Sequence, residues 1–155
     1  MSITYKNEQE KLDLIKQGIE EVMPANRILG IKIVEIKPGF TLIRVPFKDD
    51  FIGDFIQGRW HGGFLASIAD TAGGIAGATV LNSPFDRVNT IDMRIDYLHG
   101  AKKGDVYAKA RIIKRGKTII KADVELFQDE KEEPVALARC VYSVRWAESP
   151  KSDKG

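Results

Sequence analysis

The sequence predicts an α+β protein in which a curved antiparallel β-sheet wraps around one long central helix. Three observations support this prediction. The stretch His61–Leu81 repeats its large side chains every three or four residues, as amphipathic helices do. The second half of the chain alternates apolar and polar residues in strand-length segments separated by turns. No repeat or linker interrupts the chain, so a single domain over residues 1–155 is expected.

The N-terminal segment is expected to be helical and to form an extension of the domain over residues 1–24. Asn7–Met23 carries apolar residues at helical spacing between charged ones, namely Leu12, Ile15, Ile19, Val22 and Met23. Pro24 interrupts this pattern because proline cannot donate the helical hydrogen bond. Ala25–Leu29 is then expected to form a short second helical turn.

From Ile31 the spacing of apolar residues changes from the helical period to the alternation of strands. Ile31–Ile36 and Phe40–Phe47 are expected to be strands joined by a turn at Pro38–Gly39. The aromatic-rich segment Asp49–Trp60 is expected to be an irregular loop leading into the central helix. Asn82–Pro84 ends that helix.

Four further strands are expected after the helix: Val88–Leu98, Gly104–Lys114, Lys117–Phe127 and Pro134–Trp146. Arg115–Gly116 is the hairpin between the second and third of them, and Asp129–Glu133 is a charged turn. Residues 148–155 are expected to be a flexible tail.

Composition excludes several classes of protein. The net charge of +2 gives no bulk attraction to nucleic acid. The single cysteine, Cys140, excludes an internal disulfide and falls at an apolar strand position, so a packed core thiol is expected. With two histidines in the chain, neither a metal site nor a cofactor is predicted. The N-terminus lacks a secretory leader, so a cytoplasmic protein is expected, and Asp70 disfavours a membrane span through His61–Leu81.

Asp70 is the most informative residue of the chain. It is the single charged residue after His61 in the central helix, and it lies roughly 200° around the helix axis from the core position Ile68. Its neighbours on that face are small: Ala66, Ser67, Gly73, Gly74 and Gly77. Such a face admits a second backbone or a ligand. Two interpretations stay open, a structural carboxylate satisfied by hydrogen bonds and a functional one.

His61-Gly62-Gly63, with Asp70 nine positions after the histidine, resembles the PaaI-type acyl-CoA thioesterases of the hotdog fold. The likeness continues in Asn89–Leu98 and in the basic hairpin Lys114–Lys117, and it covers residues 26–146. The resemblance implies a hotdog fold and hydrolysis of a coenzyme A thioester without a cofactor.

The resemblance also implies roles for individual residues. Asp70 would be the general base or the nucleophile, the Gly62 backbone N–H would polarise the thioester carbonyl, and Thr90 would lie near the attacking water. His61 would either bond the thioester or anchor its loop. The residues expected to contact substrate are Gln57, Trp60, Gly63, Asn89, Lys114, Arg115, Gly116 and Lys117. The basic residues among them either bind the phosphates of coenzyme A or form a solvated turn.

Helix geometry adds a constraint of its own. Gly62 and Asp70 are eight residues apart, which is about 12 Å along a helix axis. One helix therefore cannot bring both groups to a single carbonyl carbon. We predict a homodimer whose active sites are shared between two subunits, and pairing of dimers into a tetramer.

Two alternative functions are retained. The first is a non-catalytic protein that binds acyl-CoA in the same pocket. The second is an enoyl-thioester hydratase of the same fold, although the D-x4-H and H-F-x3-P signatures of those enzymes are absent. Asp54 is either a second carboxylate near the site or an ordinary loop residue.

Overall fold

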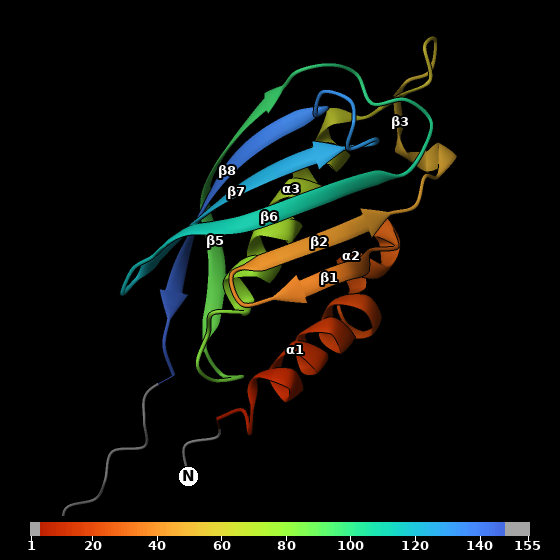
Figure 1. The fold of residues 1–155 in the computed structure, drawn as a ribbon. Coiled ribbons are helices and arrows are strands. Elements are labelled where there is room, and N and C mark those ends of the chain that lie inside the picture. The colour runs from red at the N-terminus through yellow and green to blue at the C-terminus, as the bar shows by residue number, and fades with distance from the viewer. Residues whose placement is uncertain (1–3, 148–155) are drawn as a thin grey trace, which may run out of the picture.

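The computed structural model describes residues 4–147, in which one helix packs against a six-stranded antiparallel sheet (Figure 1). The helical elements are α1 (Glu8–Gln17), the π-helical turn η1 (Gly18–Val22), α2 (Pro24–Leu29), the 3₁₀ turn η2 (Asp49–Phe51) and α3 (Gly62–Ala78). The strands are β1 (Lys32–Lys37), β2 (Phe40–Val45), β3 (Ile52–Asp54), β4 (Arg59–Trp60), β5 (Arg87–Tyr97), β6 (Val106–Arg115), β7 (Ile119–Phe127) and β8 (Ala136–Arg145).

The strand order of the large sheet is β1-β2-β6-β7-β8-β5, and each neighbouring pair is antiparallel. Helix α3 contacts five of these six strands from one side. The predicted α+β class, with a central helix covered by an antiparallel sheet, is confirmed. No helix in residues 4–147 is long and apolar enough to cross a membrane.

The N-terminal helix begins where the sequence predicts and changes its geometry before it ends. The Asn7 side chain caps α1 by accepting a 2.8 Å hydrogen bond from the Glu10 N–H. After Gln17 the chain widens into η1, closed by a 3.0 Å bond from the Met23 N–H to the Gly18 carbonyl. The predicted flexible tail, 148–155, lies outside the described residues.

The segment predicted as an irregular loop, 49–60, is more ordered than expected. It forms η2 and a small hairpin in which β3 pairs with β4, Ile52 lying opposite Trp60. The predicted hairpin at Arg115–Gly116 is shifted, because β6 continues to Arg115 and β7 begins at Ile119. The first difference is a short hairpin missed within an aromatic-rich segment, and the second concerns strand ends, which local sequence patterns define poorly.

The core lies between α3 and the sheet. The predicted apolar stripe of the helix is buried, with Leu65, Ile68, Ala72 and Ile75 at most 3% exposed. Opposite them the sheet contributes side chains that include Ile43, Val106, Ala108, Ala122 and Leu126. Cys140 is buried in this core, as its strand position predicts.

The two edges of the sheet differ. At the β1 edge, the Glu20 carboxylate accepts a 2.7 Å hydrogen bond from the Ile33 N–H, and a bulge follows between Ile33 and Glu35. Strand β5 has 11 residues and, within the described residues, pairs with β8 on one side only. The β5 edge is therefore long and open, whereas the β1 edge is short and partly blocked.

Candidate active site

The first turn of α3 is organised by His61. This residue is the N-cap, and its Nδ1 accepts a 2.9 Å hydrogen bond from the Gly63 N–H. Its own N–H donates to the Phe51 carbonyl at 2.7 Å, which ties the helix to η2. Because Nδ1 is an acceptor, the imidazole is neutral in this arrangement and carries its proton on Nε2. Of the two roles left open for His61, the contacts support anchoring of the loop.

Gly62 keeps the donor that the sequence assigns to it. Within residues 4–147 its backbone N–H donates to no acceptor, whereas the Gly63 N–H is taken by His61. The expected contact of the Gly63 N–H with substrate stays a prediction, and it would require His61 to release this N–H. The carbonyl of Gly62 accepts a 2.7 Å bond from the Tyr97 hydroxyl, and the Tyr97 ring lies over the Gly62 Cα. Unpaired N–H groups at a helix start carry partial positive charge, which suits an oxyanion.

Asp70 lies in the middle of α3, half-buried, on the side facing strand β5. Its Oδ1 accepts a 2.8 Å hydrogen bond from the Thr90 hydroxyl. The two candidate catalytic residues that the sequence places 20 positions apart are thus in direct contact. The Thr90 hydroxyl fixes one carboxylate oxygen, and the other oxygen accepts no hydrogen bond from residues 4–147.

Strand β8 holds the backbone of the helix at the same level. The hydroxyl of Tyr142 donates to the main-chain carbonyl of Asp70 at 2.7 Å, and the thiol of Cys140 lies 3.9 Å from the carbonyl of Ala69. Burial raises the pKa of Cys140 to about 11, so this thiol stays protonated at neutral pH. Burial, with smaller contributions from Cys140 and Asp70, raises the pKa of Tyr142 far above its usual value.

The small residues around Asp70 make room for the sheet. A Cβ on Gly73 would collide with the Tyr142 hydroxyl, and one on Gly77 would lie 3.6 Å from Val88. The sequence predicts that this face admits a second backbone or a ligand. The Gly73 part of the face instead accommodates a tyrosine of the same chain.

Strand β5 runs alongside α3 in the opposite direction. Val88 lies near Gly77, Thr90 contacts Asp70, and Tyr97 contacts Gly62. Eight residues of helix separate Gly62 from Asp70, about 12 Å at 1.5 Å per residue. The described chain therefore does not bring its own base and its own free N–H to one point.

Trp60 and Gln57 do not take the places expected for substrate contacts. Trp60 is 5% exposed, its ring stacks on Phe51 with centroids 5.0 Å apart, and its Nε1–H donates to the Gly104 carbonyl. Trp60 is thus packed in the core, and its expected contact with substrate stays a prediction. Gln57 is exposed in the β3–β4 turn, where its N–H donates to the Asp54 carboxylate at 3.1 Å.

Asp54 organises that turn, because its Oδ1 also accepts from the Ile56 N–H at 3.0 Å. This arrangement agrees with the interpretation of Asp54 as a loop residue. Asn89 is exposed one residue before Thr90, and successive strand side chains point to opposite faces. Its side chain therefore points away from the face that carries Thr90 and Asp70.

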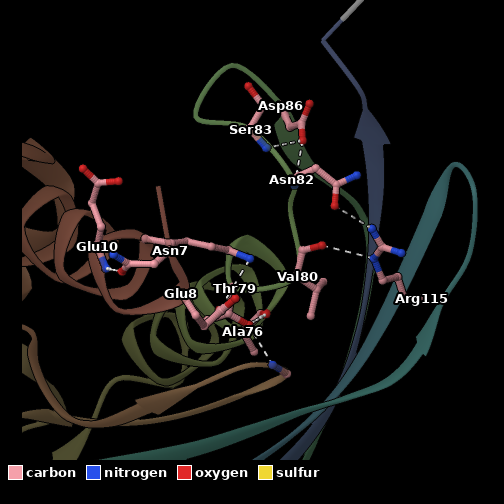
Figure 2. A network of polar contacts seen from close by, with 12 residues as sticks. Asn7, Glu8, Glu10, Ala76, Thr79, Val80, Asn82, Ser83, Asp86 and Arg115 are labelled. Carbon is pink, nitrogen blue, oxygen red and sulfur yellow. Dashed lines mark hydrogen bonds and ion pairs between the residues drawn. The ribbon is translucent and has the colours of Figure 1, made fainter. Parts of the chain in front are cut away.

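The basic hairpin between β6 and β7 is tied to the far end of α3 (Figure 2). Arg115 Nε donates to the Val80 carbonyl at 3.1 Å, and Nη2 donates to the Asn82 side chain at 3.3 Å. The guanidinium also lies over the Trp146 ring, 5.0 Å from its centroid. Arg115 thus anchors the hairpin, which differs from its expected role as a phosphate ligand.

The rest of the hairpin leaves two candidate phosphate ligands. Gly116 closes the turn through a 2.7 Å bond from its N–H to the Ile119 carbonyl. Lys114 and Lys117 are exposed, and in the described part of the chain their ammonium groups make no hydrogen bond or ion pair.

Sequence reasoning missed Tyr97 and Tyr142, the two residues whose hydroxyls bond to α3 at Gly62 and Asp70. The adjacent glycines Gly73 and Gly74 are a signal that a large side chain packs there, but the sequence does not say which one. Tyr97 follows the alternation of its strand, which predicts its face and not its hydroxyl partner.

Comparisons with known proteins identify the family of the chain. Residues 57–135 match the model of the thioesterase superfamily. The esterase-family protein SSO2140 of Saccharolobus solfataricus is 30% identical over 78% of this chain and 83% of its own length. The medium/long-chain acyl-CoA thioesterase YigI of Escherichia coli K12 is 28% identical over 88% of this chain and 95% of its own length.

Among solved structures, the PaaI protein of the E. coli phenylacetic acid degradation operon superposes with a TM-score of 0.75 at 24% identity. The superposition covers 88% of this chain and 95% of PaaI. This likeness confirms the predicted hotdog fold. The match of the family model and the relative at 30% identity extend the agreement from fold to family: the chain belongs to the thioesterase superfamily.

Proposed function

We propose that this protein is an acyl-CoA thioesterase that hydrolyses a coenzyme A thioester to the free acid and coenzyme A. The contact between Thr90 and Asp70 carries the proposal. It holds a half-buried carboxylate beside an exposed strand edge, on a helix whose first N–H lacks an acceptor in the described residues. Membership of the thioesterase superfamily and the likeness to an acyl-CoA thioesterase support the substrate class.

The chemistry requires a base and an oxyanion donor. Asp70 takes a proton from water as the water oxygen attacks the thioester carbonyl carbon, or its carboxylate attacks directly. The negative charge that develops on the carbonyl oxygen is stabilised by the Gly62 N–H at the helix start. The carbon–sulfur bond then breaks, and the thiolate of coenzyme A leaves. In the general-base route the thiolate takes up the proton that Asp70 removed from water. In the nucleophilic route the acyl group stays on Asp70 as a mixed anhydride, and water hydrolyses this anhydride to the free acid, restores the carboxylate and supplies the proton for the thiolate.

The distance between Gly62 and Asp70 supports a homodimer with shared sites. Two groups about 12 Å apart on one helix cannot act on one carbonyl carbon. Strand β5 offers the surface for a second copy, since its edge is open over 11 residues. The β1 edge is less suited because Glu20 already bonds to the Ile33 N–H.

The contacts of β5 with α3 favour one register for this dimer. Thr90 marks the level of Asp70, and Tyr97 marks the level of Gly62. If two copies of β5 pair antiparallel about a two-fold axis at Arg94, the bulge after Thr90 brings Thr90 of one opposite Tyr97 of the partner subunit, and directly opposite side chains share a face. Asp70 then faces Gly62 of the partner subunit, and two equal sites result.

The outer face of the sheet supports the proposed pairing of dimers into tetramers. It carries a hollow of about 570 Å³ lined by charged side chains of both signs, among them Arg94, Asp96, Lys109, Arg111, Asp123 and Arg139. Such a surface is complementary to its own copy after a two-fold rotation. Lys114 and Lys117 are the proposed ligands of the coenzyme A phosphates.

The test is release of thiol from short, medium, long and aromatic acyl-CoA esters by the wild type and by Asp70→Asn. We expect the wild type to hydrolyse acyl-CoA esters of one class of acyl group, and medium and long chains are tested first. Asp70→Asn is expected to lose about 10²–10⁴-fold in kcat. Binding of the ester should persist in Asp70→Asn. Asp13→Asn on α1 is the control, because its side chain accepts a bond from Gln9 that asparagine can also accept.

Turnover by Asp70→Asn at the wild-type rate would contradict the mechanism. Tight binding of one ester without thiol release from any of them would instead identify a non-catalytic acyl-CoA-binding protein.

A further inference from the structure

Two residues that face each other across strands β5 and β8 both donate to Asp70. Thr90 and Tyr142 are register partners, and side chains of directly opposite residues point to the same face of a sheet. The Thr90 hydroxyl bonds to the carboxylate at 2.8 Å, and the Tyr142 hydroxyl bonds to the main-chain carbonyl at 2.7 Å. One residue of α3 is therefore held at its side chain and at its backbone by a single cross-strand pair.

The backbone contact needs the local sequence of the helix. The carbonyl of a helical residue already accepts from the N–H four residues later, so the Tyr142 hydroxyl uses the remaining lone pair. That hydroxyl reaches the helix because position 73 is glycine, where a Cβ would collide with it. Glycine in a helix interior is unfavourable relative to alanine, so Gly73 is retained at a cost in helix propensity.

The tyrosine is a fixed donor. Tyr142 is 1% exposed, so its ring is immobilised by the core on both faces. A β-bulge follows in β5 between Thr90 and Asp92, and it leaves Ile91 56% exposed while Thr90 stays turned toward the helix. The bulge and the buried ring together fix the position along α3 at which strands β5 and β8 contact Asp70.

We propose that Tyr142 is a positioning residue of the reaction, which acts through the backbone of Asp70 and requires Gly73. The proposal rests on the function proposed above. The Thr90 bond orients the carboxylate, and core packing holds α3 against the sheet. The Tyr142 bond adds a directional contact at the backbone of Asp70 itself, which fixes the position of the carboxylate relative to the attacking water. Displacements of about 1 Å are enough to lower rates markedly.

The first test compares kcat and KM of Tyr142→Phe with those of the wild type. We expect kcat to fall about tenfold, with KM changed less than about twofold, because the base is displaced while the substrate-binding surface is kept. Tyr107→Phe is the matched control, since Tyr107 packs against Phe127 on β6 and β7 at a ring distance of 5.6 Å. Circular dichroism at the assay temperature shows that each variant is folded.

The second test is a double-variant cycle with Gly73→Ala. Alone, this change should lower both kcat and the melting temperature, because the new Cβ and the Tyr142 hydroxyl cannot occupy the same space. In the Tyr142→Phe background the nearest atom to that Cβ becomes the ring carbon Cζ, at 3.2 Å. Gly73→Ala should then change kcat by less than about twofold relative to Tyr142→Phe alone.

A kcat of Tyr142→Phe equal to that of the wild type, or an equal fall in Tyr107→Phe, would overturn the proposal. Additive losses in the double variant would also overturn it. Persistent turnover in Asp70→Asn would contradict the proposed function itself and this inference with it. Loss in Asp70→Asn together with wild-type kcat in Tyr142→Phe would contradict this inference alone.

Discussion

The first turn of α3 and its centre at Asp70 are built in opposite ways. At the first turn, His61 is exposed, Tyr97 is 50% exposed, and the Gly62 N–H has no acceptor in the described residues. At the centre, the carboxylate and the backbone of Asp70 are both held, by Thr90 and by the buried Tyr142. Helix α3 thus carries a backbone N–H without an acceptor in its first turn and a positioned carboxylate at its centre. Neither region has both groups.

Because the two regions differ in this way, a second identical chain can supply to each region the group that it lacks. Strand β5 connects the two levels, because Thr90 touches the centre of α3 and Tyr97 touches its first turn. In the proposed dimer an antiparallel copy of β5 would exchange the two levels, and the Gly62 N–H of one subunit would meet Asp70 of the other. The variants below remove either the Gly62 N–H or a contact of Asp70.

The largest effect is expected from removing the open donor. Gly62→Pro deletes the N–H and suits the first position of a helix, and His61 has the extended backbone that a residue before proline prefers. We expect kcat to fall about 10²–10³-fold, as for loss of one oxyanion-hole donor. Gly62→Ala is the control, since it adds a Cβ 3.3 Å from the half-exposed Tyr97 ring and keeps the N–H. An equal loss in both variants would assign the effect to crowding.

A smaller effect is expected at the fixed base. Thr90→Val removes the hydroxyl that bonds to Asp70 Oδ1 and keeps the shape of the side chain. We expect about a tenfold fall in kcat, since the carboxylate loses its hydrogen bond to Thr90 and only the backbone of Asp70 stays held, by Tyr142. Thr90→Ser restores a hydroxyl and should recover most of the rate. Steady-state kinetics with one ester measures both, and a Thr90→Val enzyme at wild-type kcat would mean that Tyr142 alone suffices.

How much of this could be predicted from the sequence depends on the range of the interactions. The helix, its apolar stripe and the strands follow from residue periodicity, and Asp70 was placed off the core stripe by the same count. The family resemblance places Thr90 near the attacking water, and its direct contact with Asp70 is seen only in the structure.

The sequence did not show the contacts between segments that are far apart along the chain. Trp60 is a core residue because its indole N–H meets a carbonyl 44 positions away, and Arg115 anchors the hairpin through a carbonyl 35 positions away. The glycine face of α3 accommodates Tyr142, whose hydroxyl reaches across 72 positions. A single sequence shows which residues are polar or small, but not which partner uses them.

A further prediction concerns the stability of the fold, rather than the reaction rate, under alkaline conditions at the buried Cys140. The folded pKa of Cys140, about 11, lies above its ordinary value of 9.0. The protonated thiol therefore stabilises the fold fully below pH 9, and this contribution is lost as the pH rises from 9 to 11. Two pKa units correspond to at most roughly 3 kcal/mol. Urea unfolding at pH 8 and pH 10.5 should show a smaller loss of unfolding free energy for Cys140→Ala than for the wild type. Equal losses would contradict a buried thiol.

The most direct test of the shared site is a mixed dimer of Asp70→Asn and Gly62→Pro chains, purified with two different tags. If each site takes Asp70 from one subunit and Gly62 from the other, one site of the mixed dimer carries both defects. The second site carries neither, so the mixed dimer should recover about half of the wild-type kcat per dimer. A mixed dimer as inactive as its two parents would show that each chain uses its own Asp70 and Gly62, which would contradict the account.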